Sequence, residues 1–162
     1  MPSRLPLHKE RVFMTNNDTL RRLRYALNRN DLAIAEITCK SGRETTEAEV
    51  AAWLKLEDEP GFAELTDKDL CSFLDGLIVE KRGPHPSGIV PEPVEYLSNN
   101  EILKKLRIAY NLKSDGMLTV FKKAEFDVSS AELGSFFRSA GHPKFAKCPE
   151  QVLRKFIKGL SR

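Results

Sequence analysis

The sequence predicts an all-α protein made of two tandem four-helix repeats packed with pseudo-twofold symmetry. Two observations lead to this fold class. The chain matches itself at a fixed offset of 83 residues, and in both copies apolar residues recur at the three- and four-residue spacing of one helix face. No segment shows the sustained alternation of apolar and polar residues that is typical of a half-buried strand.

The repeat aligns residues 16–79 with 99–162 without a gap, and 17 of the 64 aligned pairs are identical. A fixed internal period indicates one supersecondary unit that is used more than once. Many of the identities fall into three blocks, which begin at Asn16 and Asn99, at Pro60 and Pro143, and at Leu70 and Leu153. Three blocks in the same order favour a duplication over a chance match.

The first helix of each repeat is expected over residues 17–29 and 100–112, because leucines recur there at helical spacing. Asparagines stand at both ends of these ranges, and Asn is common at helix termini. We therefore expect Asn17 and Asn100 to cap the starts of these helices. Asn28 and Asn111 are expected to mark their ends.

The other three helices of each repeat follow from caps and apolar stripes. The second is expected to begin near Asp31 or Ser114, which suit an N-cap. The third carries a capping-box pattern, a Ser or Thr followed three residues later by Glu, at Thr46 and at Ser129. The fourth has a broad apolar stripe. The aromatic residues on these stripes are expected in the core: Trp53, Phe73, Phe136 and Phe156.

Two glycines occupy equivalent positions inside the fourth helices, Gly76 and Gly159. Glycine inside a helix costs about 1 kcal/mol relative to alanine. Its presence in both copies predicts a close helix–helix approach, which we expect at or near the pseudo-twofold axis.

Four segments make up the expected domain organisation. Residues 1–13 are expected to be a disordered N-terminal extension, 14–83 an acidic first repeat, 84–97 a proline-rich linker and 98–162 a basic second repeat. Each repeat has about 65 residues, so two packed copies would bury a larger core than one alone.

Charge separates the two repeats. Residues 16–83 hold 10 basic and 14 acidic residues, a net charge of −4, whereas residues 98–162 hold 13 and 6, a net charge of +7. The apolar fraction of 41% and the charged fraction of 30% are those of a foldable globular chain.

No apolar run is long enough for a membrane helix. The three scattered cysteines predict free thiols and a cytoplasmic location, with Cys39 and Cys71 expected to be buried.

Several spaced motifs carry a resemblance to a known family. They run from Asn16-Asn17 to Ala26, from Ala51-Ala52-Trp53-Leu54 to Gly61-Phe62, and from Leu70 to Gly83, and the second copy repeats the pattern from Asn99-Asn100 to Leu160. Over residues 14–162 the chain resembles the YehS-like family of uncharacterised bacterial proteins. The resemblance implies a tandem helical repeat and contributes no catalytic residues.

The sequence offers no catalytic, cofactor or metal constellation. His8, His85 and His142 lack a second ligand at helical spacing, and no phosphate-binding glycine loop or nucleophile elbow occurs. An acidic cluster at 57–59 could chelate a hard cation, but a solvated loop is the favoured interpretation. We therefore expect no enzyme activity, no cofactor and no metal.

Six basic residues are the candidate binding residues. Arg24 and Arg107 are retained in both copies and could bind a phosphate or carboxylate; a structural ion pair or backbone contact is the favoured interpretation. Arg154, Lys158 and Arg162 recur every four residues along the last helix, with Lys155 beside them. A basic stripe of this kind is typical of a surface that contacts nucleic-acid phosphates.

Two functional hypotheses follow. The first is a non-enzymatic helical binding module that acts through contacts with a protein partner or with itself, because the basic repeat of one copy could meet the acidic repeat of another. The alternative is a nucleic-acid-associated regulatory protein that uses the basic face of the second repeat. No membrane partner is expected.

Overall fold

The computed structural model describes residues 14–161, which form eight α-helices and no strand. Residues 1–13 and 162 lie outside the described part, and with them the expected N-terminal extension and the candidate Arg162. The first repeat contains α2 (Asn16–Leu27), α3 (Asp31–Cys39), α4 (Glu47–Leu54) and α5 (Asp67–Arg82). The second contains α6 (Asn99–Ala109), α7 (Ser114–Lys123), α8 (Ser130–Phe136) and α9 (Glu150–Leu160). The predicted all-α class is confirmed.

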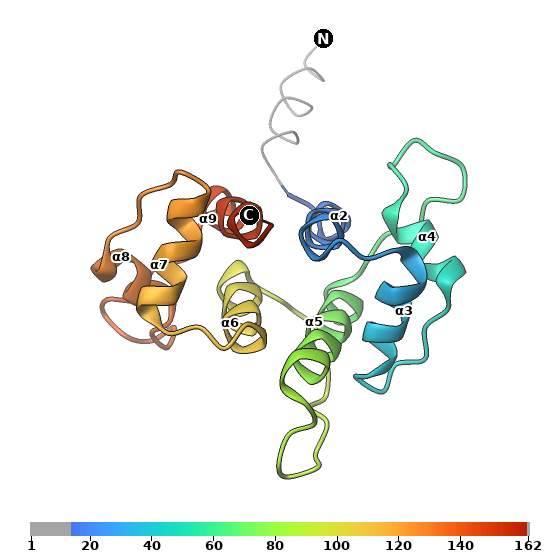
Figure 1. Cartoon of the computed structure of the whole chain (residues 1–162), viewed down its shortest axis with the longest axis horizontal. Helices are drawn as coiled ribbons and strands as arrows, with labels where there is room; N and C mark the ends of the chain where they lie inside the picture. Colours follow the sequence, from blue (N-terminus) through green and yellow to red (C-terminus); the bar gives the residue numbers. More distant parts are fainter. Residues whose placement is uncertain (1–13, 162) are drawn as a thin grey trace.

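Four central helices join the repeats, with the shorter helices on either side (Figure 1). Between the repeats, α2 packs against α9 and α5 packs against α6, so the first helix of each repeat meets the last helix of the other. Within the repeats, α3 packs against α5 and α4, and α7 packs in the same way against α9 and α8. Exchanging the repeats maps every one of these contacts onto another, as pseudo-twofold symmetry requires.

One hydrophobic core runs through both repeats. It includes all four predicted core aromatics, which are between 0 and 5% exposed: Trp53, Phe73, Phe136 and Phe156. Phe121 adds a ring 5.3 Å from that of Phe156. The expectation that these aromatics are core residues is confirmed.

Asn17 and Asn100 do not cap the first helices, contrary to the prediction. Thr15 and Ser98 cap α2 and α6, each in a full capping box. Asn17 is the second residue of α2, and its side-chain amide donates to the carbonyls of Trp53 and Ala63 at 2.8 and 2.9 Å while its oxygen accepts from the N–H of Leu65.

Asn100 makes the matching three hydrogen bonds in the second repeat, to the carbonyls of Phe136 and Ala146 and from the N–H of Cys148. Each asparagine therefore clamps the loop that enters the fourth helix onto the first helix. Buried backbone groups need partners, and this loop has no helix or sheet to supply them.

Other caps follow the sequence more closely. Asn28 and Asn111 adopt the left-handed conformation, with φ of 54° and 53°, at the ends of α2 and α6 as predicted. Asn30 caps α3, one residue before the predicted Asp31, and no side chain caps α7. Thr46 forms the predicted capping box with Glu49.

The helix glycines mark close contacts inside each repeat, and not at the pseudo-twofold axis. A Cβ on Gly76 would lie 2.0 Å from the carbonyl oxygen of Ile37 on α3, and one on Gly159 would lie 2.0 Å from that of Val120 on α7. The close approach was predicted correctly, but its location was wrong. The second and fourth helices of a repeat touch backbone to backbone, which only glycine permits.

The three cysteines are free, but they differ in environment. Cys71 and Cys148 are buried, and burial raises the pKa of the Cys148 thiol to about 12. Cys39 is exposed, contrary to expectation, because it is the last residue of α3 and its thiol exchanges hydrogen bonds with the backbone of Thr45.

Candidate nucleic-acid interface

The last helix carries the basic stripe that the sequence singles out. Its apolar side, around Leu153 and Phe156, is buried in the core. Arg154 and Lys158 are one turn apart and so share a face, with Arg154 and Lys155 half-buried and Lys158 exposed. Among the described residues, Arg154, Lys155 and Lys158 form what we call the α9 basic face.

The equivalent face of the first repeat is neutral. At the α5–α6 contact, Lys105 donates from Nζ to Oδ1 of Asp75 at 2.6 Å, and the Asp75 side chain is only 8% exposed. The thiol of the buried Cys71 lies 3.6 Å from the other oxygen of Asp75. The negative charge of Asp75 and the positive charge of Lys105 therefore cancel at this contact between the repeats.

At the α2–α9 contact, all three of these positions are basic. The 83-residue offset places Arg154 at the position of Cys71, Lys158 at that of Asp75, and Arg22 at that of Lys105. Burial, followed by the nearby charge of Arg154, lowers the pKa of the Arg22 guanidinium, although the carboxylate of Asp18 opposes this shift. We call Arg22 with the α9 basic face the α2–α9 basic surface.

Arg22 is the residue that sequence reasoning missed. It aligns with Lys105 as an ordinary basic pair, and the periodicity of α2 places it outside the leucine stripe. Only the packing of α2 on α9 brings it to the basic stripe, because the first helix of one repeat faces the last helix of the other.

Arg24 and Arg107 do not join this surface. The guanidinium of Arg24 pairs with Asp31 at 3.4 Å, within the first repeat. The guanidinium of Arg107 donates to the carbonyl of Leu112 at 3.1 Å and lies 4.6 Å from the ring centre of Phe137. Each of these contacts stabilises the turn after its own helix.

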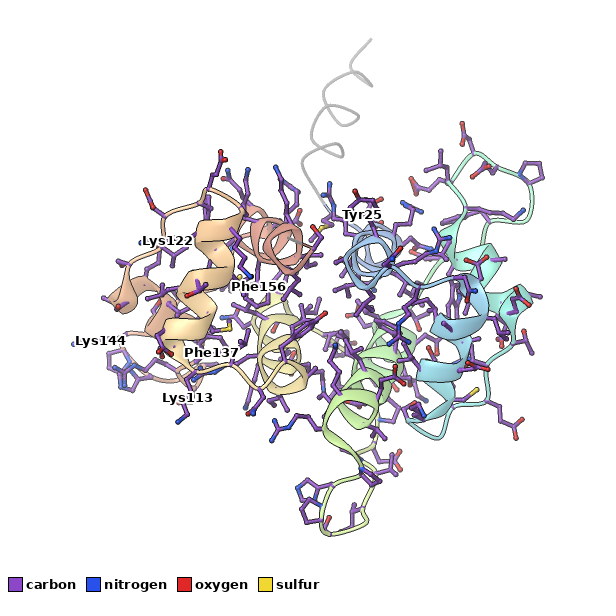
Figure 2. All side chains as sticks on the ribbon, viewed as in Figure 1. Tyr25, Lys113, Lys122, Phe137, Lys144 and Phe156 are labelled. Atoms are coloured by element: carbon purple, nitrogen blue, oxygen red, sulfur yellow. The ribbon has the colours of Figure 1, made fainter. Side chains whose placement is uncertain are left out.

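Further lysines extend the positive charge of the second repeat. Lys113, Lys122 and Lys144 are exposed and point outward from the half of the molecule that contains α7 and α8 (Figure 2). In this view Lys113 and Lys144 lie in the lower part of this half, away from α9, and Lys122 lies in its upper part (Figure 2).

Two features are absent from residues 14–161. No group of three or more His, Cys, Asp and Glu side chains there is arranged to hold a metal ion, the acidic cluster at 57–59 included. None of the described helices is long and apolar enough to cross a membrane.

Comparison with known proteins gives a family. A model described as "Protein of unknown function (DUF1456)" matches the chain twice, over residues 16–83 and 99–162. The chain belongs to this family. It is 42% identical over 148 residues to the uncharacterized protein YehS of Escherichia coli strain K12, and the match covers 91% of this chain and 95% of that protein. No solved structure matches the present chain. The YehS-like resemblance and the tandem repeat are both confirmed.

Proposed function

We propose that this DUF1456 protein is a non-enzymatic, cytoplasmic helical binding module whose ligand is nucleic acid, held by its phosphates on the α2–α9 basic surface. The observation that carries the proposal is the comparison between the two contacts that join the repeats. One holds a partly buried ion pair, Lys105 with Asp75, and the other holds Arg22, Arg154 and Lys158 at the same three positions.

Like charges gathered at a helix–helix contact cost free energy, because each cation raises the energy of the others. Burial is the larger cause of the lowered pKa of Arg22, and the charge of Arg154 adds to it. The protein's own α5–α6 contact shows that this geometry accommodates a neutral arrangement. A phosphate-bearing ligand would be attracted to a surface on which three basic residues gather.

Such binding would be independent of base sequence. The described residues of the surface are arginine and lysine, which contact phosphates, and Phe121 and Phe156 are fully buried in the core. Tyr25, three residues from Arg22 on α2, is 80% exposed, and stacking of its ring on a base would not depend on which base it is. If the surface contacts phosphates and no base edges, the protein should bind unrelated sequences with similar affinity. That affinity should fall strongly as the salt concentration rises.

The test is a binding titration of a labelled duplex and a labelled single strand, each of arbitrary sequence, by fluorescence anisotropy. The double variant Arg154→Gln with Lys158→Gln should weaken binding to both, by roughly one to two orders of magnitude at 0.1 M salt. The matched control, Lys113→Gln with Lys144→Gln, removes the same charge from the other end of the second repeat and should change affinity far less.

Self-association gives a different result in the same variants. If the basic surface instead meets the acidic repeat of a second copy, neutralising Arg154 and Lys158 shifts the protein toward monomer in sedimentation, most strongly at low salt. Unchanged nucleic-acid affinity in the double variant refutes the proposal, whether or not the mass distribution changes.

A further inference from the structure

A second basic site lies away from the α2–α9 basic surface, in a pocket of about 360 Å³ beside α6. Its cations come from three places: Arg82 at the end of α5, and Lys104 and Arg107 on α6. Ile108, Leu112 and Phe137 supply apolar walls, and no acidic residue lines the pocket. Its volume is at the small end of the range for pockets that bind small molecules.

Both arginines are held in place without losing their binding capacity. Arg82 donates from Nη1 to the carbonyl of Ile108 at 2.9 Å, and Arg107 donates from Nε to the carbonyl of Leu112 at 3.1 Å. A guanidinium has five N–H donors, so one hydrogen bond to the backbone fixes its position and leaves the others for a ligand. The stacking of Arg107 on the Phe137 ring further restricts it.

In the first repeat, the residues equivalent to two of these cations form ion pairs within the protein. There the counterpart of Arg107 is Arg24, which pairs with Asp31, and the counterpart of Lys104 is Arg21, which pairs with Asp18. Carboxylates thus neutralise both positions in the first repeat.

In the second repeat, neither of these two ion pairs forms among the described residues. Ser114 stands at the position of Asp31. Glu101, at the position of Asp18, has the same capping role and accepts from the backbone and hydroxyl of Ser98, but no ion pair between it and Lys104 forms among the described residues. The phenyl ring of Phe137 replaces the side chain of Leu54. Relative to the first repeat, the second has therefore lost two ion pairs and gained an aromatic wall.

We propose that this pocket binds a phosphate monoester on a flat, mononucleotide-sized body. Three cations with no acid favour a group that carries close to two negative charges, and planar guanidinium groups match phosphate oxygens in pairs. Ile108 and Phe137 would contact the flat body of the ligand. The phosphate can come from a free mononucleotide or from the 5′ end of a nucleic-acid strand, and the pocket chemistry is the same for both.

The decisive variant is Ser114→Asp, which introduces the carboxylate that the first repeat has. Ser114 is the first residue of α7, and an acidic side chain is favourable in the first turn of a helix, so the variant should fold. Calorimetric titration with AMP should show binding to the unmodified chain. Ser114→Asp and Arg107→Gln should each weaken that binding at least tenfold, as expected for the loss of a charge-assisted hydrogen bond.

Arg24→Gln is the matched control, because it removes the equivalent arginine from the first repeat and should leave AMP affinity unchanged. A short strand with and without a 5′ phosphate distinguishes the two sources. Binding of the phosphorylated strand that is lost in Ser114→Asp, when AMP itself does not bind, assigns the pocket to strand ends. The proposal is overturned if neither AMP nor the phosphorylated strand binds, or if Ser114→Asp binds them as the unmodified chain does. Since Arg154 and Lys158 are unchanged in these variants, failure here leaves the α2–α9 basic surface untouched.

Discussion

Adding a single methyl group at Gly159 should destabilise the protein, although alanine is the better helix former. The new Cβ would lie 2.0 Å from the carbonyl oxygen of Val120 and 2.9 Å from its carbonyl carbon, where ordinary contacts are 3.4–4 Å. The obstacle is backbone, so it cannot turn aside as a side chain could. Helices α7 and α9 would have to move apart by more than about 1 Å, and close-packed interiors resist this.

The magnitude follows from two opposed effects. Alanine in place of glycine favours the helix by about 1 kcal/mol. Overpacking costs about 1–3 kcal/mol and more when backbone must move. We expect a net loss of about 2 kcal/mol in the free energy of unfolding for Gly159→Ala and for its counterpart Gly76→Ala. For a chain of this size, that lowers the melting temperature by about 4–8 °C.

Thermal melts followed by circular dichroism measure this effect, and Gly134 provides the control. Gly134 lies inside α8, and apart from the backbone of its own helix and its chain neighbours no atom lies within 4 Å of the position of a Cβ there. Gly134→Ala should therefore gain up to about 1 kcal/mol. If Gly76→Ala and Gly159→Ala raise the melting temperature as Gly134→Ala does, the close backbone contact within each repeat does not exist.

Three further predictions concern the core, the clamp and the thiols. Phe73→Ala should lower the free energy of unfolding by about 3–5 kcal/mol, since the ring is 1% exposed, and an unchanged denaturation midpoint would place it at the surface. Asn17→Ala removes three hydrogen bonds to buried backbone and should cost about 2–3 kcal/mol, against about 1 for the cap variant Thr15→Ala; the opposite ranking would contradict the clamp. In the folded protein at pH 8, a disulfide reagent should modify Cys39 quickly and Cys148 only on unfolding, because burial raises the pKa of Cys148 to about 12; rapid modification of Cys148 would show that it is accessible.

The duplication made most of the fold predictable from sequence. Periodicity and caps are local properties, and each was observed twice, so the helices and their apolar faces could be inferred. The role of Asn17 could not, because the atoms that it binds are 36 to 48 residues away along the chain. Its identity with Asn100 indicated a shared role without revealing which one.

Contacts between helices were the part that sequence left open. The pattern predicted a close approach at Gly76 and Gly159, but nothing local says which helix approaches, and the partner is in the same repeat. For the same reason, only part of the α2–α9 basic surface could be predicted from the sequence. The stripe on α9 is a local pattern, whereas the addition of Arg22 depends on the packing of α2 against α9. The exposed position of Cys39 also depends on where the next loop turns.

The salt dependence of nucleic-acid binding tests most directly whether the α2–α9 basic surface holds phosphates. Each phosphate contact on duplex DNA contributes about 0.9 to the slope of the logarithm of the binding constant against the logarithm of salt concentration. Loss of Arg154 and Lys158 together should therefore flatten the slope by about 1.8, while the Lys113 and Lys144 control keeps the original slope. A double variant with the slope of the unmodified chain would show that these two residues contact no phosphate.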